Sequence, residues 1–174
     1  MQWTVERFQR KKHTKGKDSS WTDTLEALEA LERKSFPKSE CMSVANELGK
    51  PSVLCWVARS APVGTCSDEG NGGSSSVLGT IIVQVIRGGK YRIHKVSVAE
   101  AHRRHGIGKA LMGTFLSWIK TQSEGGKVCD LFVDVTRDPA ISLYTKHYHF
   151  HRVRRISDYY GPGRDAWYME RPCC

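Results

Sequence analysis

Residues 90–121 constrain the fold most, because they combine a predicted strand, a short basic turn and the strongest predicted helix of the chain. Residues 90–99 alternate as a strand, and residues 107–121 carry apolar side chains at helical spacing: Leu111, Phe115, Leu116 and Ile119. The turn between them reads Arg103-Arg104-His105-Gly106-Ile107-Gly108. A strand that runs through such a turn into a helix is typical of a domain in which helices pack on a sheet.

The rest of the chain predicts further elements, in the overall order β-α-α-β-β-β-α-β-α-β-β. The predicted strands are residues 3–8, 53–59, 77–87, 90–99, 128–135, 150–160 and 165–171, and the predicted helices are residues 22–34, 39–48, 107–121 and 138–146. This order predicts a mixed sheet with helices on its faces, which is an α/β or α+β layered domain. With 174 residues the chain fits a single domain over residues 1–174.

Two stretches differ in composition from the predicted core. Residues 1–20 form a basic N-terminal segment in which the first strand is followed by a run rich in Lys and Arg. Both a nuclear-import signal and a solvated basic loop fit this run. Residues 60–76 are rich in Gly and Ser, and we expect them to form a flexible loop.

The net charge of +9 favours polyanionic partners, namely a phosphorylated cofactor, nucleic acid or acidic protein segments. The six cysteines form no CxxC pair, so we expect no metal and no redox motif. The longest apolar runs are strand-length, and the first residues lack the apolar stretch of a secretory signal. We therefore expect no membrane association and a cytoplasmic or nuclear location.

The turn before the strongest helix has the chemistry of an anion site. The first backbone N–H groups of a helix have no intrahelical acceptor, and the helix dipole adds partial positive charge there. Gly106 and Gly108 let an anion approach the backbone closely, while Arg103, Arg104 and Lys109 add formal charge. A P-loop and the full dinucleotide-binding pattern are both absent. The turn therefore predicts a pyrophosphate site.

The same turn resembles a family signature. Arg103–Gly108 matches the Arg/Gln-x-x-Gly-x-Gly/Ala motif of the GNAT superfamily of N-acetyltransferases, and Ala140-Ile141-Ser142-Leu143-Tyr144 resembles its second motif, an Ala-x-x-hydrophobic-Tyr helix. The two motifs occur in the family's order, and the resemblance covers roughly residues 77–170. It implies a mostly antiparallel seven-stranded sheet that is splayed between the fourth and fifth strands, with helices on both faces.

The resemblance also implies acetyl-CoA as cosubstrate and a set of residues that bind it. Pantetheine would pair with the backbone near Val96 and Val98, and the backbone amides of the turn would hold the pyrophosphate. The implied cofactor-binding residues are Val96, Val98, Arg103, Arg104, His105, Gly106, Ile107, Gly108 and Lys109. The acetyl group would pass directly to an amine in a ternary complex.

Acetyl transfer needs a group that protonates the leaving thiolate and one that deprotonates the amine. Tyr144 occupies the family's tyrosine position and is the implied general acid. For the base, period-two alternation places Arg92, His94, Val96 and Val98 on one strand face. Arginine stays protonated. His94 is therefore the candidate, as in the similar arylalkylamine acetyltransferases, and Asp134 is the competitor.

The chain departs from the N-terminal acetyltransferase branch at two positions. Phe132 stands where that branch often has a glutamate or histidine base, and Arg137 stands where it often has an asparagine that contacts the cofactor. These departures leave the identity of the base and part of the cofactor contact open.

The acceptor is indicated by residues 157–169, which resemble the Tyr-Tyr…Asp-Ala-x-x-Met ending of N-terminal and ribosomal-protein acetyltransferases. Tyr159 and Tyr160 would then contact the acceptor, a protein N-terminal or lysine amine. Small-molecule amines such as arylalkylamines or polyamines, and a protein that binds CoA without catalysis, remain open. Arg152 and Arg154 could line a phosphate groove, but without a recognised nucleic-acid-binding pattern we do not expect direct nucleic-acid binding.

Overall fold

The structure is a computed structural model, and it describes residues 2–9, 19–61, 75–122 and 128–173. The basic run of residues 10–18 lies outside the described residues. The greater part of the Gly/Ser-rich loop, residues 62–74, also lies outside them. The two readings of the basic run and the flexibility expected of the Gly/Ser-rich loop therefore stay predictions.

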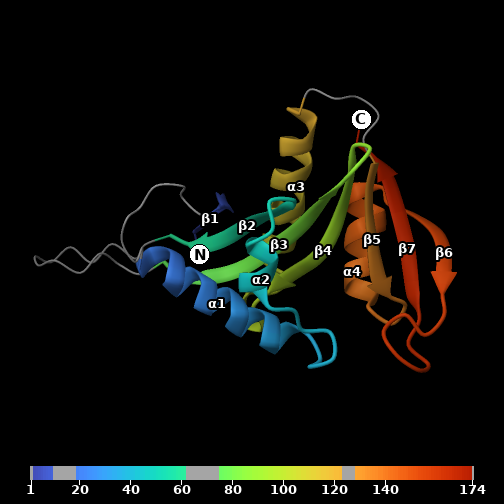
Figure 1. The fold of residues 1–174 in the computed structure, drawn as a ribbon, viewed down its shortest axis with the longest axis horizontal. Coiled ribbons are helices and arrows are strands. Elements are labelled where there is room, and N and C mark those ends of the chain that lie inside the picture. Colours follow the sequence, from blue (N-terminus) through green and yellow to red (C-terminus); the bar gives the residue numbers. More distant parts are fainter. Residues whose placement is uncertain (1, 10–18, 62–74, 123–127, 174) are drawn as a thin grey trace, which may run out of the picture.

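Seven strands form one sheet in the order β1-β2-β3-β4-β5-β7-β6 (Figure 1). Their bounds are Trp3–Phe8 (β1), Val53–Ser60 (β2), Val77–Ile86 (β3), Lys90–Val98 (β4), Val128–Asp134 (β5), His151–Ile156 (β6) and Ala166–Pro172 (β7). Strands β4 and β5 pair in parallel, and the other neighbouring strands pair antiparallel. The predicted mixed, mostly antiparallel sheet is confirmed.

Helices cover both faces of this sheet, as predicted (Figure 1). On one face lie α1 (Ser19–Ser35) and α2 (Val44–Leu48), over a core that includes Leu28, Val57 and Ile82. On the other lie α3 (Ile107–Lys120) and α4 (Asp138–Ser142), over a larger core that includes Ile81 and Phe115. A π-helical turn, η2 (Leu143–His147), continues α4, and a short 3-10 turn, η1 (Glu100–His102), precedes α3.

The first helix begins at Ser19 rather than residue 22, and two further predicted boundaries are wrong for local reasons. The second helix starts at Val44 rather than residue 39, because the Ser43 side chain caps it by accepting the N–H of Asn46 at 3.3 Å. The sixth strand ends at Ile156 rather than residue 160, because Asp158 has a φ of 55° and the chain leaves the sheet there. Both changes lengthen loops, residues 36–43 and 157–165, which line the pocket described below.

The sheet opens between β4 and β5. These strands pair only where Lys90–Ile93 faces Val128–Leu131, and beyond this point the pairing ends. Figure 1 shows the two strands diverging from there. The predicted splay is therefore confirmed.

The prediction that Arg92, His94, Val96 and Val98 share one face of the strand is wrong, because β4 has a β-bulge at the start of this opening. Ile93 pairs with Val83 and Lys95 with Ile82, so His94 has no partner in the β3 register. The extra residue reverses the alternation. Val96 and Val98 consequently pack on the α3 side, against the core that also contains Ile93, whereas Arg92 points away from that core toward Asp130.

Candidate active site

The backbone of β4 presents a free edge along the opening. Ala99 donates its N–H to Leu78 O at 2.8 Å, so the backbone groups of Ala99 point toward β3. Because these groups alternate in direction along a strand, those of Val96 and Val98 point the other way, into the opening. Arg103 Nε donates to Val98 O at 3.2 Å, which agrees with that direction. The two predicted pantetheine positions therefore carry polar groups on an edge that β5 does not cover.

The predicted pyrophosphate turn begins α3. Gly106 is the N-cap, in the left-handed region at a φ of 81°, and nothing lies within 4 Å of the position a Cβ would take. Ala110 donates to Gly106 O at 2.9 Å, so the N–H groups that precede it lie at the open end of the helix. Ile107 is buried and anchors the turn, whereas the polar side chains of the turn are exposed: Arg103, Arg104, His105 and Lys109.

The turn and the β4 edge lie against each other. A Cβ built on Gly108 would lie 3.7 Å from a methyl group of Val98 and 3.7 Å from one of Leu143, so the helix start packs between β4 and η2. A phosphorylated ligand held at the turn could therefore extend along Val98 and Val96. The donor set fits acetyl-CoA: open N–H groups and cations for the pyrophosphate, and a free strand edge for the amide-bearing arm.

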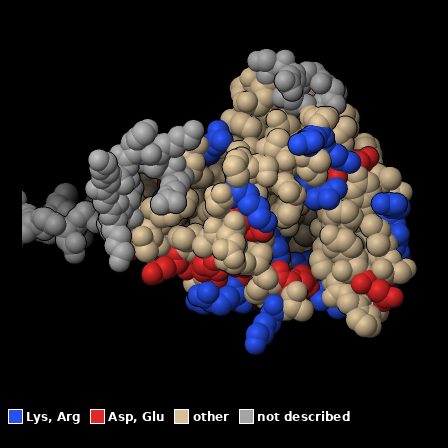
Figure 2. Space-filling view, viewed as in Figure 1, with Lys and Arg blue, Asp and Glu red and all other residues tan. Residues whose placement is uncertain are grey.

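A pocket of about 360 Å³ lies at the far end of this edge, where β4 and β5 diverge. It is lined by Phe36, Ser39, Glu40, residues 92–96, Phe132, Val133, Asp134, Arg137, Ala140, Tyr144, Tyr159 and Tyr160. The space-filling view is hollowed between the α1–α2 side and the β5–β7 side of the molecule, with charges of both signs at the lower rim (Figure 2). The pocket thus joins the opened sheet to loops from both halves of the chain.

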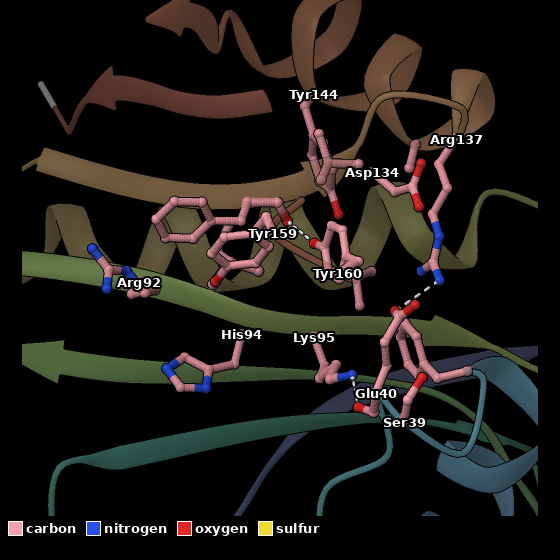
Figure 3. Close-up of a pocket in the computed structure, with 16 residues that line it drawn as sticks. Ser39, Glu40, Arg92, His94, Lys95, Asp134, Arg137, Tyr144, Tyr159 and Tyr160 are labelled. Carbon is pink, nitrogen blue, oxygen red and sulfur yellow. Dashed lines mark hydrogen bonds and ion pairs between the residues drawn. The ribbon is translucent and has the colours of Figure 1, made fainter. Parts of the chain in front are cut away.

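Tyr144 reaches this pocket from η2. Its side chain is buried, packs against Phe150 with ring centroids 5.9 Å apart, and points into the pocket toward Tyr160 (Figure 3). Burial raises the pKa of Tyr144 to about 12. The hydroxyl therefore stays protonated at neutral pH, as a proton donor must.

The two candidate bases have different surroundings. His94 is exposed at the pocket wall, and its Nε2 lies 2.9 Å from Oε1 of Gln84. Desolvation lowers the pKa of His94, and the Arg92 cation adds to this against an opposing contribution from Glu47. The imidazole is therefore mostly neutral at pH 7 and able to accept a proton.

Asp134 is a poorer candidate base. Burial raises the pKa of its carboxyl, but hydrogen bonds from the Thr136 N–H (2.9 Å) and hydroxyl (2.7 Å) and from Arg164 (2.6 Å) outweigh burial and hold it below the ordinary value. A carboxylate so well satisfied has little tendency to take a proton at neutral pH.

Tyr159 and Tyr160, the predicted acceptor contacts, both line the pocket from the loop of residues 157–165. The Tyr159 ring stacks on Phe132, with centroids 4.6 Å apart. The Tyr160 hydroxyl donates to Phe132 O at 3.1 Å, on the edge of β5 that β4 has left (Figure 3). Phe132 therefore supports Tyr159 and Tyr160, which together form one side of the pocket, here called the aromatic wall.

Sequence reasoning missed Glu40, Lys95 and Arg164. Glu40 is almost fully buried in the loop of residues 36–43 and forms ion pairs with Arg137 and Arg164. Lys95 donates to the backbone oxygen of Glu40 at 2.7 Å. Glu40 and Arg137 are 97 positions apart in the chain, and the polar stretch around Glu40 has no distinguishing pattern, so only the folded chain brings them together.

These features fit a long phosphorylated ligand that would lie along the opened sheet with its far end beside a buried tyrosine. The profile of the acetyltransferase (GNAT) family matches residues 21–150, and the chain belongs to that family of acyltransferase enzymes. Among the described helices, none is long and apolar enough to cross a membrane. Nor do three or more His, Cys, Asp or Glu side chains gather as a possible metal site within the described ranges.

Curated relatives and solved structures agree with this assignment. N-alpha-acetyltransferases of Sulfolobus acidocaldarius and Saccharolobus solfataricus are 37% and 34% identical to the chain over 83 residues. The match covers 48% of this chain and 48% of each relative, so the chain spans about half the length of the curated relatives it matches.

Two solved structures share the fold. The ribosomal-protein-S18-alanine N-acetyltransferase from Escherichia coli has a TM-score of 0.70 at 20% identity, covering 99% of this chain and 94% of that one. Arabidopsis thaliana NAA60 in complex with acetyl-CoA has a TM-score of 0.71 at 21% identity, covering 98% of both chains. At these identities the likeness shows the fold alone.

Proposed function

We propose that the protein transfers an acetyl group from acetyl-CoA to a primary amine, and that the acceptor is a protein N-terminal or lysine amine. The observation that carries the proposal is the free edge of β4, which runs from the open N-terminus of α3 past Val98 and Val96 to the pocket of Tyr144. One end of that path suits a pyrophosphate, and the other holds a protonated hydroxyl.

Acetyl-CoA supplies an acetyl group activated as a thioester. The backbone N–H groups between Arg104 and Lys109 bind the pyrophosphate, and the exposed cations of the turn strengthen that binding at low salt. The backbone at Val96 and Val98 orients the pantetheine arm. The Tyr144 hydroxyl then donates its proton to the leaving thiolate.

His94 is the proposed base. Because a carboxamide oxygen only accepts hydrogen bonds, the Gln84 contact assigns the N–H of the neutral ring to Nε2 and leaves Nδ1 to take a proton. His94 and Tyr144 line the pocket from opposite sides, so we propose that a water carries the proton from the amine to His94. Deprotonation gives the amine the lone pair that attacks the thioester carbon directly, in a ternary complex.

The proposal of a protein acceptor has two supports. The curated relatives are named N-alpha-acetyltransferases. In addition, the wall formed by Tyr159 and Tyr160 offers apolar contact together with hydroxyl groups that can bind a peptide backbone. A location in the cytoplasm or nucleus remains our prediction.

Titration calorimetry with acetyl-CoA, followed by a thiol-release assay, tests the function. The assay compares N-terminal peptides, lysine peptides and arylalkylamines at equal concentration. We expect acetyl-CoA to bind and a peptide to give the highest kcat/KM. Absence of acetyl-CoA binding would refute the proposal, and binding without thiol release on any amine would leave a protein that binds CoA without catalysis.

A further inference from the structure

Four charged side chains, Glu40, Asp134, Arg137 and Arg164, form a cluster at the pocket, here called the acceptor clamp. The first three line the pocket, and Arg164 pairs with two of them. Arg137 lies 3.0 Å from Oε2 of Glu40, and Arg164 lies 2.7 Å from Oε1 of the same carboxylate. Arg164 also lies 2.6 Å from Oδ2 of Asp134. Figure 3 shows Glu40 and Arg137 meeting across the pocket from different elements.

The acceptor clamp ties together segments that are far apart in the chain. Glu40 belongs to the loop of residues 36–43 between α1 and α2, and Arg164 belongs to the loop of residues 157–165, which also carries Tyr159 and Tyr160. Asp134 is the last residue of β5, and Arg137 is the N-cap of α4. The two loops on either side of the pocket are thus joined through a single carboxylate.

Burial makes these ion pairs hard to break one at a time. The side chain of Glu40 is 7% exposed and that of Asp134 is 3% exposed, so each carboxylate would be left buried without a counter-charge if its cations moved away. Lys95 also stabilises the loop of residues 36–43. Its Nζ donates to Glu40 O and lies 3.7 Å from the ring centroid of Phe36. Residues 36–43 are therefore fixed before any acceptor arrives.

The ordering of the two loops before the acceptor binds should affect large acceptors more than small ones. A pocket of about 360 Å³ can enclose a small amine, whereas a peptide must continue beyond it and contact the surrounding loops. Loops that are already ordered add no ordering cost when the peptide binds. The acceptor clamp should therefore favour peptides and have little effect on small amines.

We propose that Glu40 is a specificity-determining positioning residue: through Arg164 and Arg137 its carboxylate holds the two pocket loops at the separation that a polypeptide acceptor requires. This rests on the proposed acetyltransferase function. Glu40 acts through the loops, so its loss changes peptide binding without changing the acetyl-CoA site.

Two variants distinguish this positioning role of Glu40 from a simple attraction between the pocket and a cationic amine. Glu40→Gln removes a negative charge and Arg164→Ala removes a positive one, yet both break the acceptor clamp. If the clamp sets specificity, both raise the KM of a peptide acceptor, by about tenfold where the lost contact is worth a typical charged hydrogen bond. If the pocket only attracts a cationic amine, Glu40→Gln raises that KM and Arg164→Ala lowers it. Opposite directions would overturn the proposal.

A matched control lies in the same region. Arg155→Ala removes the same charge and breaks an ion pair with Asp165, at 2.7 Å, but Arg155 is not part of the acceptor clamp. We expect it to leave the peptide KM unchanged. In both clamp variants the acetyl-CoA affinity and the kcat/KM of an arylalkylamine should change less than the peptide KM. An equal loss for peptide and small amine would contradict the proposal, and Arg164→Lys should recover part of the peptide KM.

Hydrogen exchange tests the tie between the loops independently of activity. Arg164→Ala should speed backbone amide exchange in residues 36–43 of the acceptor-free protein, and Arg155→Ala should not. Unchanged exchange in that segment would overturn the proposal even if the enzyme is active. If the wild type acetylates no amine, the proposed function fails, whereas the exchange result still decides whether the loops are coupled.

Discussion

The two ends of the candidate site are built in different ways. At the cofactor end, residues 96–109 are contiguous, and the groups that matter are backbone N–H and C=O groups on a strand edge and a helix start. At the acceptor end, side chains arrive from residues 36–43, from β4 and β5, from η2 and from residues 157–165. One end depends on backbone conformation, and the other depends on the identity of side chains.

This difference has a consequence for mutation. A backbone site tolerates changes of side chain but not changes that disturb its φ and ψ angles. A side-chain site shows the reverse, because a single functional group can be removed while the fold is kept. Substitutions at the two ends should therefore separate into effects on acetyl-CoA affinity and effects on turnover or acceptor binding.

Tyr144→Phe should give the largest effect. The ring keeps its packing against Phe150, but the proton donor to the thiolate is lost, so kcat should fall by about 10²–10³-fold. Steady-state kinetics of thiol release measure this. Acetyl-CoA affinity measured by calorimetry should stay at the wild-type value. An unchanged kcat would remove Tyr144 from the mechanism and weaken the distinction between the two ends.

His94→Gln should give the next largest effect, with kcat/KM reduced by about 10²-fold at pH 7. The pKa of His94 is lowered from its ordinary value of 6.5, so the base is deprotonated at neutral pH and becomes protonated only as the pH falls below that value. The wild-type pH–rate profile should therefore decline on the acid side below pH 6.5, and the variant should lack that limb. A variant profile that overlays the wild type would exclude His94 as the base.

The sequence could predict most of the cofactor end because its information is local. Glycines and cations at a strand-to-helix turn are visible in six consecutive residues. The element order followed from the periodicity along the chain, and the splayed sheet was implied by the family resemblance. Even the bulge at His94 left a signal in the pattern. Tyr91 and Ile93 are apolar at odd positions and Val96 and Val98 at even ones, so the phase of the alternation shifts between them.

The acceptor end could be predicted only in part. Tyr144, Tyr159 and Tyr160 were recognisable because they fall within motifs, and the structure brings all three to one pocket. Glu40 and Arg164 were not, since their role comes from ion pairs between distant loops. The loop of residues 36–43 was itself concealed, because helix-forming residues continue up to the Ser43 cap and made the second helix look longer than it is.

Gly106→Val tests the cofactor end and should weaken acetyl-CoA binding by about tenfold. A β-branched residue held at a φ of 81° costs on the order of 1–2 kcal/mol. No atom lies within 4 Å of the new Cβ, so a loss would report backbone strain and a blocked approach rather than a clash inside the protein. Calorimetry with acetyl-CoA measures this.

Arg104→Gly is the matched comparison for that change. Arg104 also has a positive φ, of 67°, so glycine removes its charge without straining the backbone. We expect only a few-fold loss of acetyl-CoA affinity, shrinking as salt is raised. If Arg104→Gly weakens binding more than Gly106→Val, the cofactor end depends on side chains as much as the acceptor end does.

Tyr160→Phe should give the smallest effect, because it removes only one hydroxyl group from the acceptor end. The lost hydrogen bond to Phe132 O lies on an open strand edge, where water can replace it, so the cost should be about 1 kcal/mol or less. The peptide KM should rise a few-fold at constant kcat. Tyr159→Phe is the comparison, because it removes the other hydroxyl of the aromatic wall and keeps the ring stacking on Phe132. Equal effects of the two changes would support direct binding of the acceptor by both hydroxyls, whereas no effect of either would leave the aromatic wall with apolar contact alone.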